Sequence, residues 1–369
     1  MAGHGRTEHG ARLVSDVAVL VTGAGGYVGS RVADRYRAAG ASVLRHGRRA
    51  KATESSDTRP DLAPWDFADG ALADDNPFAG VSAEWRRRIT HIVHAAAVTR
   101  FDVSREEAQA VNVGGTAKVM DLARSCPRIR SLGLVSTVYA TGLLAGRIEE
   151  DLADPGDGFA NNYEWSKSQA EELVAGDDAL PWRILRMATV VADDPSGQVT
   201  QRNAFHETLK LWFHGLLPLV PGDPSTPLYL VTGKFSVEAI IALMDPERPG
   251  GVYHLAPEAA DCLTLAAAVE LITEAFESVE TFRRRRILRP LLADWESFEM
   301  LASGVGDFGG SLVRRSLQSV VPFARQLFVV KELTNDRLRA ELGDYVAPDP
   351  AELVRRTCGW LVANGWASA

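Results

Sequence analysis

The chain has 369 residues, of which 46% are hydrophobic and 24% charged, and its net charge is −8. This length exceeds one typical domain of roughly 150 residues, so the chain accommodates a nucleotide-binding domain and a smaller second lobe. The acidic balance argues against non-specific nucleic-acid binding. No window approaches about 18 uninterrupted apolar residues, so no membrane span is expected.

The N-terminus and the cysteines indicate the expected compartment. Residues 1–16 are polar and lack the apolar core of a signal peptide, so we expect a mobile tail. Cys126, Cys262 and Cys358 lie far apart and are odd in number, which fits neither a disulfide framework nor a zinc site. We therefore expect a reducing, cytoplasmic setting and no metal.

Residues 17–29, with the sequence VAVLVTGAGGYVG, predict a buried strand that turns through glycines into a helix. Gly23 permits the tight turn, Gly26 lets the main chain approach a pyrophosphate, and Gly29 lets the helix pack closely on the strand. Backbone amides and the positive helix end then face the phosphates. A glycine turn of purely structural use is the alternative. The residues expected at the cofactor here are Thr22, Gly23, Gly25, Gly26, Tyr27, Val28 and Gly29.

Residues 41–49 predict a second strand with a basic end. NAD-binding proteins usually place Asp or Glu there to hold the ribose hydroxyls, and this segment has neither. Arg48, with Arg49 or Arg45 beside it, would instead pair with a 2′-phosphate, which predicts NADPH. The alternative is that these arginines only solvate a loop.

Two further strand ends are expected near the dinucleotide. Asp66 and Phe67 are candidates for the edge of the adenine, although a simple strand-end turn explains them equally well. Residues 89–97 predict a buried strand that ends in the small residues Ala95, Ala96 and Ala97, across which a dinucleotide can lie. His94 at this end is interpreted as a structural hydrogen-bonding group rather than as a general base.

The next elements continue an alternation of helix and strand. A helix is expected from residue 104 to about residue 126, and its glycines next to Asn112 suggest close packing. Residues 132–140 predict a strand that carries Ser136 and Thr137 near its end. This order predicts an α/β fold with a Rossmann-type, doubly wound parallel sheet.

The residues expected to carry chemistry follow on a helix over residues 162–174. Tyr163 and Lys167 are four residues apart and so share one face. An ammonium near a phenol favours the phenolate, and each unit of pKa depression from about 10 takes about 1.4 kcal/mol. Tyr163 is therefore a proton donor to an oxygen that gains charge as hydride arrives, and Thr137 would bind the same oxygen. Ser136 is the fallback for Thr137.

These motifs resemble the extended short-chain dehydrogenase/reductases. Residues 22–29 match the family's TGxxGxxG, while Thr137, Tyr163 and Lys167 match its Ser/Thr, Tyr and Lys. Within that family the chain is most similar to fatty acyl-CoA reductases and to the thioester-reductase domains of carboxylic acid reductases and of peptide or polyketide synthetases. The resemblance covers roughly residues 17–260, and its most specific segments are residues 94–102, 111–116, 135–142 and 190–197, with a short echo at residues 332–338.

The resemblance implies NADPH-dependent reduction of an acyl thioester to an aldehyde, with a second hydride giving the alcohol. It adds Asn112 and Met187 to the expected cofactor contacts, besides Lys167. Met187 stands where the family usually has proline, so the nicotinamide loop is expected to differ. We expect no adenylation or carrier domain before the reductase, so the acyl group would come from a separate CoA ester or carrier protein. We expect a monomer or homodimer.

The order of the elements sets the expected domains. The dinucleotide-binding domain takes residues 17–197, and residues 233–257 return to it. A smaller, mainly helical substrate lobe takes residues 198–232 and 258–369.

Two features of this lobe have competing interpretations. Phe205, Leu209, Trp212 and Leu216 recur at helical spacing, and a helix packed on the core is favoured over a lid for an acyl chain. The basic run over residues 283–286, followed by Arg289, is more simply a solvated helix face than a site for a phosphopantetheine phosphate or an acidic carrier.

Other functions stay open at this stage. A ketone reductase or alcohol dehydrogenase would use the same Thr137, Tyr163 and Lys167 on a carbonyl that has no leaving group. Sugar-nucleotide epimerases usually retain NAD, which Arg48 disfavours. A non-catalytic nucleotide sensor would have no need of a proton donor, so the intact triad disfavours it.

Overall fold

The computed structural model describes residues 16–48, 65–156, 158–300, 320–343 and 348–366. Arg49 and nearly all of the expected N-terminal tail lie outside these residues. The chain divides into two compact units. The first unit comprises residues 1–137, 166–186 and 237–253, and the second comprises residues 138–165, 187–236 and 254–369. The segment 138–165, which we assigned from sequence to the dinucleotide-binding domain, thus groups with the second unit.

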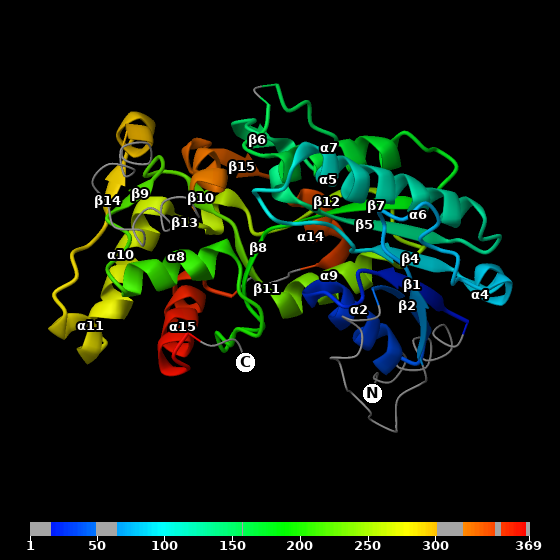
Figure 1. Cartoon of the computed structure of the whole chain (residues 1–369), viewed down its shortest axis with the longest axis horizontal. Helices are drawn as coiled ribbons and strands as arrows, with labels where there is room; N and C mark the ends of the chain where they lie inside the picture. The colour runs from blue at the N-terminus through cyan, green and yellow to red at the C-terminus, as the bar shows by residue number, and fades with distance from the viewer. Residues whose placement is uncertain (1–15, 49–64, 157, 301–319, 344–347, 367–369) are drawn as a thin grey trace, which may run out of the picture. The chain divides into compact units, whose positions relative to one another are not determined.

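A seven-stranded sheet forms the centre of the first unit (Figure 1), and its strand order is β12-β7-β5-β4-β1-β2-β3. The strands are β1 (Ala18–Thr22), β2 (Ser42–Gly47), β3 (Trp65–Asp69), β4 (His91–His94), β5 (Ser131–Thr137), β7 (Trp182–Met187) and β12 (Gly251–Leu255). The pairings of β1 with β2 and β4, of β2 with β3 and of β4 with β5 are all parallel. The order reverses next to β1, which is where open α/β sheets bind ligands. The predicted doubly wound parallel sheet is confirmed.

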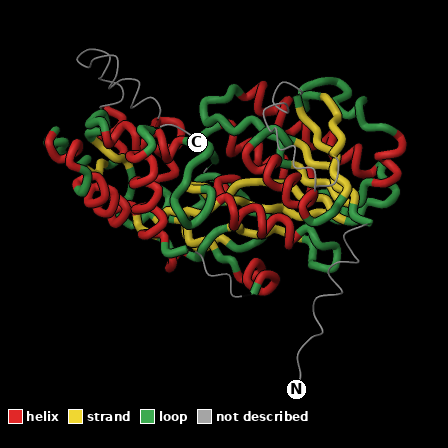
Figure 2. The backbone as a smooth tube through the Cα atoms, turned by 90° about the horizontal axis from the view of Figure 1, so that it is seen from below, coloured by secondary structure: helices red, strands yellow, loops and turns green. Residues whose placement is uncertain are grey.

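Helices cover both faces of this sheet, and its central strands are buried. All five residues of β1 and all four of β4 are buried, as expected for strands enclosed on both sides. Figure 1 shows α6 (Gly114–Arg124) and α7 (Asn162–Ala175) on one side and α2 (Tyr27–Ala38) and α9 (Gly233–Leu243) on the other. Figure 2 shows the strands next to one another with helices on either side.

The helix expected from residue 104 is built from three pieces. Ser104 caps α5 (Arg105–Ala108), a π-helical turn follows over Gln109–Val113, and α6 continues the run. Asn112 lies in the π-helical turn, a feature that often marks functional sites. A side chain at Gly115 would place its Cβ 2.8 Å from the Cβ of Leu72, so close packing explains the glycine.

Short strand pairs and helices form the second unit. Three pairs are parallel, namely β8 (Thr189–Ala192) with β11 (Leu230–Thr232), β6 (Gly146–Ile148) with β15 (Lys331–Leu333), and β9 (Leu219–Pro221) with β14 (Leu291–Ala293). The pair β10 (Pro227–Leu228) and β13 (Leu263–Thr264) is antiparallel. The main helices are α8 (Ala204–Phe213), α10 (Leu265–Glu277), α11 (Glu280–Arg284), α14 (Asp336–Leu342) and α15 (Pro350–Ala363).

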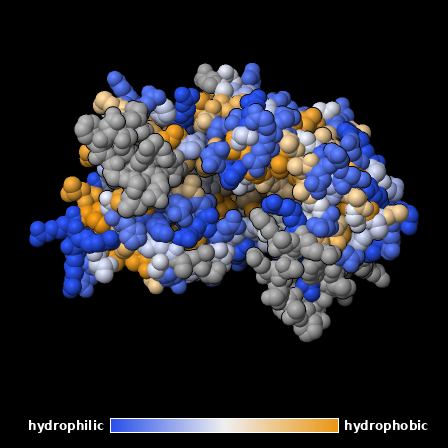
Figure 3. Space-filling view, viewed as in Figure 1, coloured by the Kyte–Doolittle hydropathy of each residue, from blue (hydrophilic) through white to orange (hydrophobic). Residues whose placement is uncertain are grey.

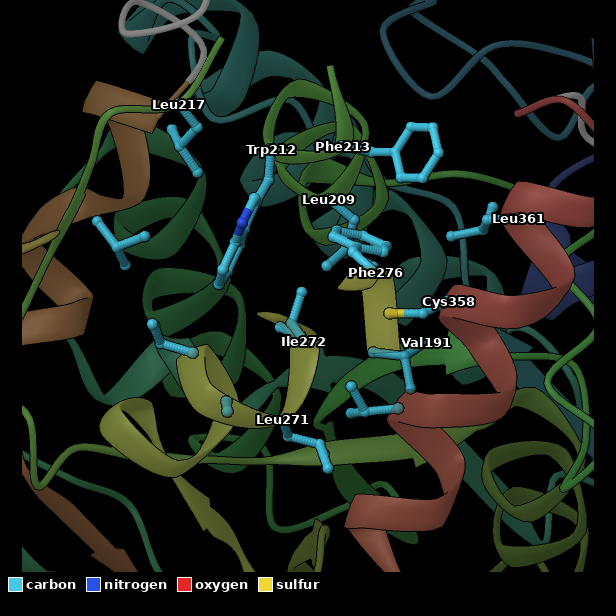
Figure 4. Packing of buried hydrophobic residues seen from close by; sticks show 14 of the residues in the cluster. Val191, Leu209, Trp212, Phe213, Leu217, Leu271, Ile272, Phe276, Cys358 and Leu361 are labelled. Carbon is cyan, nitrogen blue, oxygen red and sulfur yellow. The ribbon is translucent and has the colours of Figure 1, made fainter. Parts of the chain in front are cut away.

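Helix α8 packs its apolar face on the core of the second unit. Leu209, Trp212 and Phe213 from α8 point into a cluster with Phe276 of α10 and residues of α15 (Figure 4). Leu209 and Trp212 are each only 2% exposed. The helix is therefore packed on the core, as favoured from sequence, and these side chains are not available as a lid.

Three arginines of the basic run around α11 have partners within the second unit. Arg284 pairs with Glu280, and Arg289 lies 3.1 Å from Glu270. Arg285 donates to the Phe213 carbonyl at 2.7 Å and lies over its ring. The surface over α11 is hydrophilic (Figure 3), which supports a solvated helix face. Among the described residues, none of the helices has both the length and the hydropathy needed to cross a bilayer.

Candidate active site

The glycine turn between β1 and α2 has the shape expected of a dinucleotide-binding turn. Gly23 has a φ of +68°, and a Cβ there would lie 2.7 Å from the backbone of Ala96. A Cβ on Gly29 would lie 2.3 Å from the Gly23 carbonyl oxygen. Gly25 and Gly26 are exposed, and within the described chain no side chain caps the start of α2 at Gly26. A bare helix start beside an open glycine loop fits a pyrophosphate.

His94 connects this turn to the helix that carries Asn112. Its Nδ1 lies 2.7 Å from Thr22 Oγ1, and its Nε2 lies 3.0 Å from Thr116 Oγ1. Thr116 donates its hydroxyl proton to the Asn112 carbonyl, so it accepts from His94. The proton of neutral His94 is thereby assigned to Nε2, and Thr22 donates to Nδ1. Burial lowers the pKa of His94 to about 3. His94 is thus a structural group, as interpreted from sequence.

This burial predicts an acid-sensitive fold. The pKa of His94 falls from 6.5 to about 3 on folding. Between these values the unfolded chain binds a proton that the folded chain excludes, so the free energy of unfolding falls as the pH falls. The contribution of His94 to this slope approaches roughly 1.4 kcal/mol per pH unit. Urea unfolding of the protein and of His94→Asn from pH 7 to pH 3 should give a shallower slope in the variant; equal slopes would contradict the assignment.

Asn112 positions two neighbouring segments. Its Oδ1 accepts from the Val98 amide at 2.8 Å, and its Nδ2 donates to the Val98 carbonyl at 3.0 Å and to Ser166 Oγ at 2.8 Å. Both amide protons and the carbonyl oxygen of the side chain are therefore in use. Asn112 joins the loop that follows Ala95, Ala96 and Ala97 to α7. Ser166 was not singled out from sequence, because nothing in its local sequence marks it as the partner of Asn112.

Lys167 lies in the second turn of α7 and is buried, with 3% exposure. Its Nζ donates to the Val135 carbonyl of β5 at 2.9 Å. Burial lowers the pKa of Lys167 to about 8, and the charge of Glu171 opposes that fall. The ammonium is thus held at the carboxyl half of β5, within the strand that ends in Thr137.

Ser136 and Thr137 are separated by the alternation of the strand. The Ser136 hydroxyl donates to Glu171 Oε1, inside a buried ion pair between Glu171 and Arg186. Ser136 is therefore engaged in this pair, and the structure disfavours it as the fallback hydroxyl. Thr137 is the last residue of β5 and is 7% exposed, which leaves it as the candidate.

The first turn of α7 carries Tyr163 and is held by hydrogen bonds to Glu164. The Oδ1 of Asn161 accepts from the Glu164 amide at 3.0 Å, and Glu164 accepts from the Ala160 amide at 3.0 Å. This reciprocal arrangement works like a capping box. Gln326 also donates to Glu164, at 2.8 Å, and burial raises the pKa of Glu164 to about 7. Tyr163 is half-buried and one helical turn before Lys167.

The residues expected on the adenosine side of the cofactor lie on or near β2 and β3. Arg45 is buried and paired with Asp34 of α2, so it is not placed beside Arg48 for a phosphate. Arg48 is exposed directly after β2. One oxygen of Asp66 accepts from Trp85 Nε1 at 2.6 Å. Phe67 is half-buried and Met187 is buried at the end of β7.

Arg31 is a cation near the glycine turn that sequence analysis missed. Its guanidinium lies 3.7 Å from the centroid of the Tyr27 ring and donates to the Tyr27 carbonyl at 3.3 Å. The sequence places Arg31 within α2, where a helical arginine has no distinguishing signal. In the structure it orders the Tyr27 side chain by stacking. Among the described residues, no group of His, Cys, Asp and Glu side chains is arranged to hold a metal ion.

The chain is similar in fold to several proteins of known structure. It matches the terminal R domain of the myxalamid PKS-NRPS pathway with a TM-score of 0.74 at 24% identity, covering 96% of this chain and 92% of that one. It also matches the Bordetella bronchiseptica enzyme WbmG, solved with NAD and UDP, with a TM-score of 0.66 at 17% identity and 95% coverage of both chains.

At the level of sequence, residues 79–240 match the family model described as Male sterility protein. This stretch contains Asn112, Thr137, Tyr163 and Lys167. Fatty acyl-CoA reductase wat of Drosophila melanogaster is 24% identical over 226 residues, which are 51% of this chain and 44% of the relative. The match thus spans less than half the length of that relative. These findings confirm the resemblance to fatty acyl-CoA reductases and terminal reductase domains.

Proposed function

We propose that the protein is an oxidoreductase that uses NADPH to reduce an acyl thioester to an aldehyde. The observation that carries the proposal is the position of Tyr163 one helical turn before a buried Lys167 on α7, where Lys167 donates to the strand that ends in Thr137. The likeness to fatty acyl-CoA reductase wat and to a PKS-NRPS terminal domain supports the thioester as substrate.

The residues around the glycine turn fit a dinucleotide. Gly25 and Gly26 are open to solvent, and the uncapped start of α2 offers amide groups to a pyrophosphate. The NAD-bound likeness supports a nicotinamide cofactor. Arg48 after a strand without acidic residues supports NADPH over NADH. When bound, the reduced nicotinamide supplies a hydride to the substrate carbonyl carbon.

Three side chains would then stabilise the negative charge that develops on the substrate oxygen. Thr137 donates a hydrogen bond to the oxygen, and Tyr163 donates its phenolic proton as negative charge develops there. Lys167 as an ammonium stabilises the resulting phenolate. Collapse of the tetrahedral carbon breaks the carbon–sulfur bond, and the thiol leaves with a proton, so that one aldehyde and one thiol form per hydride. A second hydride, from a second NADPH, would convert the aldehyde to the alcohol.

Release of free thiol distinguishes reduction of a thioester from reduction of a ketone. Purified protein is incubated with NADPH and a panel of acyl-CoA and acyl-carrier thioesters, and in parallel with ketones, while free thiol and NADPH are followed together. Thiol release coupled to NADPH oxidation supports a thioester reductase. Turnover of ketones with no thiol from any thioester would favour the ketone reductase. NADPH binding with no turnover of either would favour a nucleotide sensor.

Cofactor preference is predicted to depend on Arg48. Replacing Arg48 by Glu puts a negative charge next to the 2′-phosphate, and charge-assisted contacts of this kind are each worth about 1.5–3 kcal/mol. The dissociation constant for NADPH should rise roughly 10-fold to 100-fold, while that for NADH changes little. Binding of both cofactors is measured by fluorescence titration.

Arg128→Glu makes the same change of charge at an exposed arginine that pairs with Asp16 and serves as the matched control. It should leave both affinities unchanged. An unaltered NADPH/NADH ratio in Arg48→Glu would mean that Arg48 only solvates its loop.

A further inference from the structure

A buried ion pair that the proposed chemistry does not use lies one helical turn beyond Lys167. Glu171 of α7 and Arg186 of β7 are 3% and 1% exposed at their side chains. Arg186 Nη2 donates to Glu171 Oε2 at 2.7 Å, and its Nε lies 3.1 and 3.2 Å from the two carboxylate oxygens. Ser136 donates to the same carboxylate. The Glu171 carboxylate is thus held by three side-chain donor groups from two strands.

The charge of Glu171 affects the protonation state of Lys167. A lysine buried to this extent loses much of its hydration, and burial alone favours the neutral amine. Glu171 lies on the same helix face and acts on Lys167 with the opposite charge. On β4, His94 also interacts with Lys167, and it is neutral in the folded protein because its pKa is about 3. Glu171 therefore supplies a negative charge that favours the buried ammonium, and Arg186, which pairs with Glu171, offsets part of it.

We propose that Glu171 is a positioning residue for Lys167, and that Arg186 and Ser136 fix its carboxylate so that the ammonium stays charged and directed at the Val135 carbonyl. The pair does not contact substrate in this account. It acts through Lys167, so the consequence for catalysis rests on the proposed function, whereas the electrostatic link between Glu171 and Lys167 does not.

A pair kept only for folding would behave differently. Buried ion pairs are weak evidence for stability, because desolvation offsets much of their attraction, and replacing both partners by apolar residues is often neutral. A double replacement Glu171→Met with Arg186→Met leaves no orphan charge. If the pair served stability alone, this variant would refold without any change at Lys167.

The test measures the protonation of Lys167 directly. The full chain, saturated with NADP⁺ to favour the folded state, is labelled with ¹⁵N-lysine, and the Nζ resonance of Lys167 is titrated by NMR. The variants are Glu171→Asp, Glu171→Gln and the double Met variant. The midpoint should fall slightly in Glu171→Asp and by about one pH unit or more in Glu171→Gln. It should fall less in the double Met variant than in Glu171→Gln, because the positive charge of Arg186 is removed as well. The alkaline limb of kcat should move down in parallel.

Glu150→Gln is the matched control. Glu150 is also a buried carboxylate, but it accepts from the backbone amides of His254 and Leu338 at 2.9 and 3.2 Å in the second unit. Its variant should leave the Lys167 midpoint unchanged. If any folded Glu171 variant, including Glu171→Asp alone, keeps the parental midpoint, the proposal is wrong. The NMR readout needs no substrate, so failure of thioester reduction would be seen separately.

Discussion

Tyr163→Phe should lower kcat for the reduction by roughly 10²-fold to 10⁴-fold, which is the range usually contributed by a positioned proton donor. The substitution removes only the phenolic oxygen from a half-buried side chain in the first turn of α7. The glycine turn and Lys167 remain, so the dissociation constant for NADPH should change less than about threefold. Steady-state kinetics and cofactor titration on the same preparation measure both quantities.

Tyr253→Phe is the matched control for this variant. The Tyr253 hydroxyl donates to the Pro249 carbonyl at 2.7 Å on β12, so its loss removes a structural hydrogen bond. It should lower the free energy of unfolding by about 1 kcal/mol and leave kcat unchanged. A Tyr163→Phe protein with parental kcat would remove Tyr163 from the reaction, and equal losses in the two variants would indicate a general effect on folding.

Gly23→Ala should abolish measurable NADPH binding, raising the dissociation constant by about 100-fold or more. Two effects act together at this position. The φ of +68° is strained for any residue with a Cβ. The new Cβ would also meet the backbone of Ala96 at 2.7 Å and the carbonyl carbon of Ala95 at 2.9 Å, and backbone yields less readily than a flexible side chain. The turn must therefore shift away from the strand end where the dinucleotide would lie.

Gly40→Ala is the control that separates backbone strain at a positive φ from a clash of the new Cβ with neighbouring backbone. Gly40 has a φ of +88°, but a Cβ there would meet nothing within 4 Å. This variant should lose about 1 kcal/mol of stability and keep its NADPH affinity. Isothermal titration calorimetry on both variants, with thermal unfolding as the check on folding, makes the comparison. Parental affinity in a folded Gly23→Ala protein would contradict the assigned role of the turn.

The sequence predicted the central sheet because its signals are local. A glycine turn after an apolar strand, and a tyrosine and a lysine at helical spacing, are properties of single segments. The order β3-β2-β1-β4-β5 follows from such alternating elements once they are assumed to wind in the usual right-handed way. The π-helical turn at Asn112 was not foreseen, because periodicity does not distinguish one inserted residue in a helix.

The partners of Ser136 and Arg45 could not be predicted from the sequence, because they are distant in the chain. Ser136 and Thr137 are equivalent hydroxyls on paper, and only the position of Glu171, 35 residues away, shows that Ser136 is engaged. Arg45 belongs by sequence to a basic run, yet Asp34 of α2 pairs with it. Such pairings follow from tertiary packing, which determines the neighbours of each buried charge.

The pH dependence of the proposed reaction also follows from a tertiary contact. The pKa of Lys167 is lowered from 10.5 to about 8 because the side chain is buried. The ammonium form is therefore lost as the pH rises through about 8, and kcat should fall on the alkaline side of that value. The pH profile of kcat from pH 6 to pH 10 measures this, and an unchanged rate up to pH 10 would show that the charged form is not required.

The most direct test of the proposed function is a single-turnover reaction with an acyl thioester and NADPH that carries deuterium at the transferred position of C4. Aldehyde is trapped as it forms, thiol is titrated, and the product is examined by mass spectrometry. The proposal predicts one thiol released and one deuterium on the aldehyde carbon for each cofactor oxidised. Cofactor oxidation without thiol release, or aldehyde without deuterium, would contradict it.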